Sequence, residues 1–133
     1  MPDRSTPARC PRSCVIVDDE RRGREFLANI LSSHFPEISL AGQAQSVEEA
    51  VALIASIKPD IVFLDIEIIG GTGFDVLDRI GDERQAIVFI SAHAHYQEES
   101  ARYPHAGFLL KPVSILDLRA VLKICDEMYR AIP

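Results

Sequence analysis

Five short apolar runs alternate along the chain with longer stretches in which apolar residues recur at helical spacing. The clearest runs are unbroken and rich in β-branched residues, which is typical of strands covered on both faces of a sheet. Polar residues follow each run, so the runs have the length of strands rather than of buried helices. The predicted strands are residues 14–17, 38–41, 61–64, 86–90 and 108–110.

A stretch with helical spacing follows each predicted strand, and local signals mark where several of these helices begin or end. The first helix stops near Pro36, Ser46 with Glu49 has the spacing of a capping box, and Ser114 is placed to cap the final helix. The fourth helix, at about 97–103, is short and polar. The apolar positions that recur at helical spacing in the other helices are Phe26, Leu27, Ile30 and Leu31; Val47, Ala50, Val51 and Ile54; Phe74, Val76, Leu77 and Ile80; and Leu118, Val121, Leu122 and Cys125.

The alternation of strands and helices determines the expected fold class. Strands separated by helices pair in parallel through right-handed crossovers, so we predict an α/β fold with five parallel strands and five helices in an open, doubly wound sheet. Residues 1–13 contain three prolines and three arginines without periodicity and are predicted to be a flexible segment. Residues 14–133 then form one domain.

Composition and charge narrow the class of protein further. With 133 residues, 47% of them hydrophobic, the chain has enough apolar material for one folded domain. A formal net charge of -6 disfavours binding to nucleic acid or to an anionic membrane. No apolar run approaches the ~18–20 residues that span a bilayer, and residues 1–13 lack the apolar stretch of a secretory signal. Three cysteines fit a reducing compartment, so a cytoplasmic location is expected.

Polar side chains stand at the ends of four predicted strands. Asp18 and Asp19 follow the first strand, Asp65 the third, Ser91 the fourth and Lys111 the fifth. Any one of them could simply end an apolar run. Because the carboxyl ends of parallel strands meet at one edge of the sheet, the four together favour a functional site there.

The chemistry of these groups points to phosphoryl transfer. Two like charges 4 Å apart repel by about 4 kcal/mol at an effective dielectric of 20, so Asp18, Asp19 and Asp65 need a cation between them. Mg²⁺ prefers such carboxylate ligands, and Lys111 adds a fixed positive charge. These cations can bind the oxygens of a phosphoryl group while a carboxylate attacks it. Asp65 stands alone at its strand end and is the predicted nucleophile, whereas Asp19, with Asp18 assisting through water, would hold the metal.

In these motifs the sequence resembles the receiver domain of two-component response regulators, over Cys14 to about Arg130. Each motif alone is weak, but four of them occur in the family's order and spacing. The step from Ser91 to Lys111 is short for that family and is most similar to regulators with a LytTR-type DNA-binding domain. The motifs are Val17-Asp18-Asp19-Glu20, Phe63-Leu64-Asp65 with Gly73 eight residues on, Ile90-Ser91-Ala92, and Leu110-Lys111-Pro112.

The resemblance implies a flavodoxin-like sheet of order 2-1-3-4-5 and a role for each strand-end residue. Asp65 would accept a phosphoryl group from a sensor histidine kinase or a histidine phosphotransfer protein. The implied Mg²⁺ ligands are Asp19, Asp65 and the backbone carbonyl of Glu67, with Asp18 assisting. The domain would be a signalling switch that catalyses only its own phosphorylation and dephosphorylation.

The resemblance also implies how the switch works. The Ser91 hydroxyl would close on the phosphoryl group, Lys111 would form its salt bridge, and rotation of Phe108 would report the change. The surface of the fourth helix, fifth strand and fifth helix would then control an output domain or a partner protein. A phosphorylation-dependent homodimer is left open, and a cis Lys111–Pro112 peptide is expected from the family alone.

Two departures from the family pattern lie beside Asp65. Ile69 stands where the family usually has proline, within a loop that contains three glycines, so we expect a loosely held loop and a less certain metal affinity. Glu67 adds a carboxylate that could contact the metal or affect hydrolysis of the acyl phosphate. The sequence does not decide between these two roles.

Several alternatives are weaker. A phosphatase of the haloacid dehalogenase type expects Asp-x-Asp, whereas Glu67 occupies the third position here, and a scaffold that is never phosphorylated would not need the full set of site residues. His93 and His95 are interpreted as solvated polar residues. Cys10 and Cys14 lack the second pair of a zinc site. The arginines at 21, 22 and 24 are interpreted as the solvated face of a helix, with kinase docking as the alternative.

Overall fold

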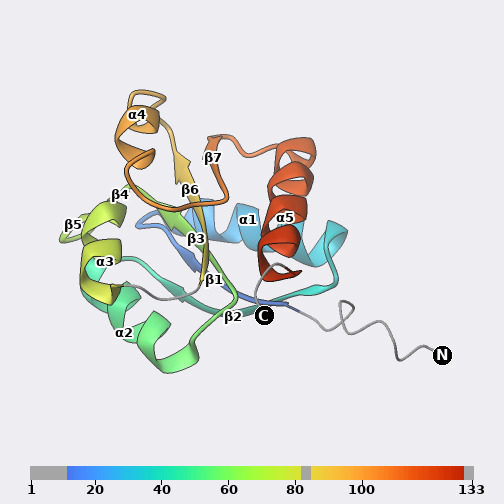
Figure 1. Cartoon of the computed structure of the whole chain (residues 1–133). Coiled ribbons are helices and arrows are strands. Elements are labelled where there is room, and N and C mark those ends of the chain that lie inside the picture. Colours follow the sequence, from blue (N-terminus) through green and yellow to red (C-terminus); the bar gives the residue numbers. More distant parts are fainter. Residues whose placement is uncertain (1–11, 82–84, 131–133) are drawn as a thin grey trace.

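A parallel sheet of five strands forms the centre of the molecule, with helices on both of its faces (Figure 1). The computed structural model describes residues 12–81 and 85–130, so most of the predicted N-terminal segment, with Cys10, lies outside the described residues. The strands of the sheet are β1 (Arg12–Val17), β2 (Ile38–Ala44), β3 (Ile61–Asp65), β6 (Ala86–Ser91) and β7 (Gly107–Leu110). Their order, β2-β1-β3-β6-β7, confirms the predicted order 2-1-3-4-5.

Helices cover the sheet on both sides, as the sequence pattern predicts. They are α1 (Arg21–His34), α2 (Val47–Ile57), α3 (Gly73–Ile80), α4 (Tyr96–Ser100) and α5 (Ile115–Arg130). One core lies between the sheet and α1 with α5, and contains the buried thiols of Cys14 and Cys125. The second core lies between the sheet and α2 with α3.

The two cores explain why the strand sequences are continuous apolar runs. Successive side chains of a strand point to opposite faces of the sheet, and both faces are covered here. In β3, Phe63 faces the core under α1 and α5, while Val62 and Leu64 face the core under α2 and α3. All five residues of β3 are buried, including its last residue, Asp65.

Side-chain caps begin three of the helices. The Ser46 hydroxyl accepts from the Glu49 amide at 3.1 Å, but the Glu49 carboxylate accepts from the amide of Gln45 rather than from that of Ser46. The capping box predicted for α2 is therefore only half formed. A complete box joins Thr72 to Asp75 at the start of α3, and Ser114 caps α5 as predicted.

Strands β3, β6 and β7 are each one residue longer than predicted, and three other elements differ from the prediction by two or more residues. β1 begins at Arg12, β2 extends to Ala44, and α4 has only five residues. The earlier start of β1 has a tertiary cause, because the Arg12 guanidinium bonds Asp126 at 3.1 Å and lies 4.5 Å from the ring centroid of Tyr129. These contacts come from α5 and leave no signal in the local sequence.

The glycine-rich loop after β3 is a hairpin of β4 (Glu67–Ile68) and β5 (Gly71–Thr72), a correction to the loosely held loop expected from sequence. Its turn is anchored to the connection between β2 and α2. The Val47 amide donates to the Ile69 carbonyl at 2.9 Å, and the Ile69 amide donates to the Gln45 carbonyl at 3.2 Å. Backbone hydrogen bonds thus replace the restraint that a proline would have supplied.

Two further sequence expectations can be compared with the fold. The Lys111–Pro112 peptide is cis, as the family resemblance implied. Within residues 12–81 and 85–130, no helix has the length and apolar character required to cross a membrane.

Gly107 allows β7 to pack closely against α5, which gives a test of the fold. A Cβ atom at this position would lie 2.5 Å from Cγ2 of Val121, which is buried. We expect Gly107→Ala to lower the free energy of unfolding by about 1–3 kcal/mol through overpacking, as measured by urea denaturation. Leu110→Ala, at an exposed position of the same strand, serves as the control and should cost less. Equal losses for the two variants would contradict this packing.

Candidate functional site

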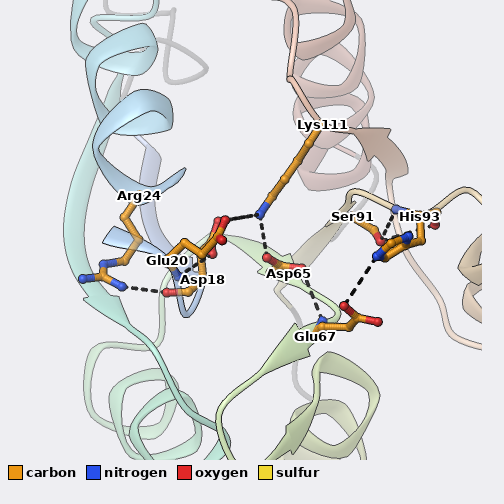
Figure 2. A network of polar contacts seen from close by, with 8 residues as sticks. All are labelled: Asp18, Glu20, Arg24, Asp65, Glu67, Ser91, His93 and Lys111. Atoms are coloured by element: carbon orange, nitrogen blue, oxygen red, sulfur yellow. Dashed lines mark hydrogen bonds and ion pairs between the residues drawn. The ribbon is translucent and has the colours of Figure 1, made fainter. Parts of the chain in front are cut away.

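The strand ends converge as the topology predicts. Asp18 follows β1, Asp65 ends β3 and Lys111 follows β7, and Figure 2 shows the Lys111 side chain reaching across to both aspartates. Asp18, Asp19 and Asp65 each offer a carboxylate oxygen within 4.8 Å of the others. Asp18 and Asp65 are buried, whereas Asp19 is exposed to solvent.

Lys111 is the positive centre of the site. Its Nζ atom donates to Oδ2 of Asp65 at 2.8 Å and to Oδ2 of Asp18 at 3.0 Å. A third carboxylate, that of Glu20, lies 4.0 Å from the same amine. One ammonium group therefore balances two buried carboxylates from neighbouring strands, which relieves part of the repulsion expected from sequence.

Contacts from the start of α1 and the residue before it hold Asp18 in place. The Glu20 amide donates to Oδ1 of Asp18 at 2.9 Å, and the Arg24 guanidinium donates to the Asp18 carbonyl at 2.8 Å. Gly23 leaves room for this carboxylate, because a Cβ atom there would lie 2.4 Å from Oδ2 of Asp18. The interpretation of the arginines as a solvated face is confirmed for Arg21, which pairs with Glu25 in solvent, but is wrong for Arg24.

Burial and charge shift the proton affinities of the site. Burial raises the pKa of Asp65 to about 6, an effect larger than the lowering by Lys111. Desolvation and the neighbouring Asp18 carboxylate also raise the pKa of Asp19. Burial alone would lower the pKa of Lys111, but its hydrogen bonds to Asp65 and Asp18 raise it overall. Asp65 is thus a carboxylate whose negative charge is poorly solvated, and a cation would stabilise it.

The donor set fits a hard divalent cation. Three carboxylates with oxygens this close supply the ligands that Mg²⁺ prefers, and the exposed Asp19 leaves one side open for water. Glu67 lies two residues after Asp65, at the start of β4, and the role of its backbone carbonyl as a ligand stays a prediction.

Ser91 lies at the end of β6 with its hydroxyl engaged by the following loop. It accepts from the His93 amide at 2.9 Å and donates to the His93 carbonyl at 3.3 Å, and the residue is only 1% exposed. The hydroxyl therefore has to exchange a partner before it can bond a group on Asp65. Phe108 is half-buried and packs against the core on the α2 and α3 side, so its role in a switch stays a prediction.

The loop after β6 also contacts Glu67. Oε2 of Glu67 accepts from the Tyr96 hydroxyl at 2.7 Å. Oε1 of Glu67 lies 3.7 Å from Nε2 of His93, and Figure 2 shows these two side chains directed toward each other. Among the described residues, no group of three metal-ligating side chains includes His93 or His95. The part played by Tyr96 was missed, because nothing in the sequence pairs residues 67 and 96.

A cavity opens beside the carboxylates, between α1 and the segment after β7. Its volume is about 320 Å³, and most of its walls are apolar. Phe26 of α1 is 48% exposed and lines this cavity with Pro112, and Asp18, Asp65 and Lys111 line it as well. The carboxylate cluster thus adjoins an apolar recess.

Comparison with known proteins agrees with this geometry. Residues 14–123 match the family described as the response regulator receiver domain. The positive alginate biosynthesis regulatory protein of Pseudomonas aeruginosa is 39% identical over 118 residues, which cover 87% of this chain and 48% of that protein. Sensory transduction protein LytT of Enterococcus faecalis is 33% identical over 122 residues, or 90% of this chain and 50% of that protein.

Solved structures show the same fold. The signal receiver domain of the putative response regulator NarL from Mycobacterium tuberculosis has a TM-score of 0.78 at 26% identity, and the match covers 88% of this chain and 97% of that one. The chain spans about half the length of the curated relatives it matches. Fold, strand-end residues and relatives together show that this chain belongs to the response regulator receiver domain family of two-component systems.

Proposed function

We propose that this chain is a phosphorylation switch in which Asp65 accepts a phosphoryl group. Mg²⁺ would be bound by Asp19, Asp65 and the carbonyl of Glu67, with Asp18 assisting. The donor would be the phosphohistidine of a sensor histidine kinase or a histidine phosphotransfer protein. The observation that carries this proposal is the Lys111 amine bonded to both Asp65 and Asp18 at the joint edge of three strands.

The proposed reaction needs little beyond charge and position. An Oδ atom of Asp65 attacks the phosphorus atom, the phosphorus–nitrogen bond breaks, and its electron pair stays on the imidazole of the donor. Bound Mg²⁺ would neutralise charge on the phosphoryl oxygens. Lys111 already lies 2.8 Å from Asp65 and can transfer a hydrogen bond to the new group.

The switch would follow from the charge that is added. A phosphoryl group brings nearly two negative charges and strong acceptors to Asp65, which favours donation by the Ser91 hydroxyl. Ser91 would then leave the His93 carbonyl and draw the loop between β6 and α4 with it. We propose that the shift, reported by Phe108, reaches the surface of α4, β7 and α5 and controls an output domain or partner protein.

The setting of the switch is part of the same proposal. We propose a cytoplasmic location. We also propose that this domain makes no direct contact with nucleic acid, because its net charge is -6. A phosphorylation-dependent homodimer stays an alternative to control of a partner. Because Asp65 lines the apolar recess together with Phe26 and Pro112, we propose that the donor histidine approaches Asp65 through this recess.

Labelling at Asp65 is the direct test. We expect a small acyl phosphate with Mg²⁺ to add one phosphoryl group to the wild-type protein and none to Asp65→Asn, because the amide is not a nucleophile. Intact mass spectrometry measures the gain. Asp117→Asn makes the same change at an exposed acidic residue of α5 and should be labelled like the wild type.

Two results would contradict the proposed function. A wild-type protein that is labelled by no donor would favour the scaffold alternative. Multiple-turnover hydrolysis of a simple phosphomonoester would favour the phosphatase.

Magnesium binding should depend on pH through Asp65. Because the pKa of Asp65 is raised to about 6 in the folded state, its ionised form is disfavoured by folding, and stability falls as pH rises from about 4 through 6. Mg²⁺ binds the ionised form and should restore that stability. We expect millimolar Mg²⁺ to raise the Tm by several degrees at pH 7.5, and by much less at pH 5, in scanning calorimetry. A Tm increase of the same size at both pH values would show that Mg²⁺ does not bind at Asp65.

A further inference from the structure

The side chain of Glu67 is turned away from the amine that neutralises the other carboxylates. Figure 2 shows it directed toward His93, on the opposite side of Asp65 from Lys111. Its backbone amide nevertheless donates to Oδ1 of Asp65 at 3.3 Å. A carboxylate attached to the chain at this point could come close to a phosphoryl group on Asp65 if its side chain were not held.

Two residues of the β6–α4 region hold this carboxylate outward. The Tyr96 hydroxyl donates to Oε2 at 2.7 Å, and Nε2 of His93 lies 3.7 Å from Oε1. The Tyr96 ring is itself fixed, because its centroid lies 6.3 Å from that of Phe74 and 4.3 Å from that of His95. The hydrogen bond to Glu67 raises the pKa of Tyr96, which keeps the phenol protonated as a donor.

The outward position matters because of the charge on the group that is to bind. An approaching phosphoryl group is an anion, and a second carboxylate beside Asp65 would repel it. The same carboxylate near the metal ligands would attract a cation. Turning Glu67 inward would therefore weaken binding of the phosphoryl group and strengthen binding of the cation.

We propose that Tyr96 is a positioning residue that holds the Glu67 carboxylate away from the space beside Asp65 where the phosphoryl group would bind, and so keeps the site open to anions. The inference rests on the proposed phosphorylation of Asp65. It assigns a role to the tyrosine and to the extra carboxylate, both of which the proposed reaction leaves without one.

Tyr96→Phe is the central variant because it removes only the donor hydroxyl. The probes are Mg²⁺ alone and beryllium trifluoride with Mg²⁺, an anionic mimic of the phosphoryl group, both titrated by calorimetry. We expect the dissociation constant of the beryllium fluoride to rise about three- to tenfold, the effect of one partly screened charge nearby. The dissociation constant of Mg²⁺ should be unchanged or lower.

Tyr103→Phe is the matched control. Tyr103 stacks on the same Phe74 ring and donates its hydroxyl to Asp78 at 3.1 Å, away from the carboxylates of the site. Loss of this hydroxyl should leave both dissociation constants at the wild-type values.

The Glu67→Gln background tests whether Tyr96 acts through the charge. With a neutral amide at this position, adding Tyr96→Phe should no longer weaken binding of the beryllium fluoride. If Tyr96 had a purely structural role, Tyr96→Phe would weaken binding of both Mg²⁺ and the beryllium fluoride, and it would still do so in the Glu67→Gln background. Either result would overturn the proposal. Unchanged or tighter binding of the beryllium fluoride by Tyr96→Phe would also overturn it.

The wild-type protein separates failure of this inference from failure of the proposed function. If the wild type does not bind the beryllium fluoride, the proposed function fails as well. If the wild type binds it and Tyr96→Phe has no effect, only this inference fails.

Discussion

The concentration of negative charge at one edge of the sheet is the constraint around which the site is organised. Three carboxylates within 4.8 Å of one another are unstable unless cations lie among them. Lys111 supplies one such charge and bonds the two buried aspartates. One amine balances only part of this negative charge, and the remainder is the physical reason for proposing that a divalent cation and a phosphoryl group bind here. The arrangement of the site and its proposed reactivity thus have the same electrostatic origin.

The fold maintains this arrangement by burying β3, the strand that ends at Asp65. β3 lies in the middle of the sheet with cores on both sides, so Asp65 is held in a poorly solvated position at its end. Burial raises the pKa of Asp65 to about 6, which makes its negative charge dependent on a neighbouring cation. In the segment that follows β3, the Glu67 amide donates to the Asp65 carboxylate. In the segment that follows β6, the His93 amide donates to the Ser91 hydroxyl.

Those two segments also show how a local departure from the family pattern is accommodated. Without proline at position 69, the glycine-rich loop gains its order from backbone hydrogen bonds to the connection between β2 and α2. The carboxylate of Glu67 gains a donor in Tyr96, at the start of α4. In both cases a residue distant in the chain supplies the restraint. The hydrogen bond from Tyr96 also connects the segment after β3, which contains Glu67, to the segment after β6, the strand that ends at Ser91.

The sequence by itself determined the α/β class, the five strands of the sheet and the meeting of Asp18, Asp65 and Lys111. The order of the strands was expected from the family resemblance. Apolar periodicity and crossover handedness act along the chain, so they can be recognised without coordinates. Only the tertiary structure decided that Arg24 bonds the Asp18 carbonyl, that Gly23 makes room for the Asp18 carboxylate, and that Tyr96 holds Glu67. These contacts depend on side-chain direction and on distances between separate elements, which the one-dimensional order of residues does not specify.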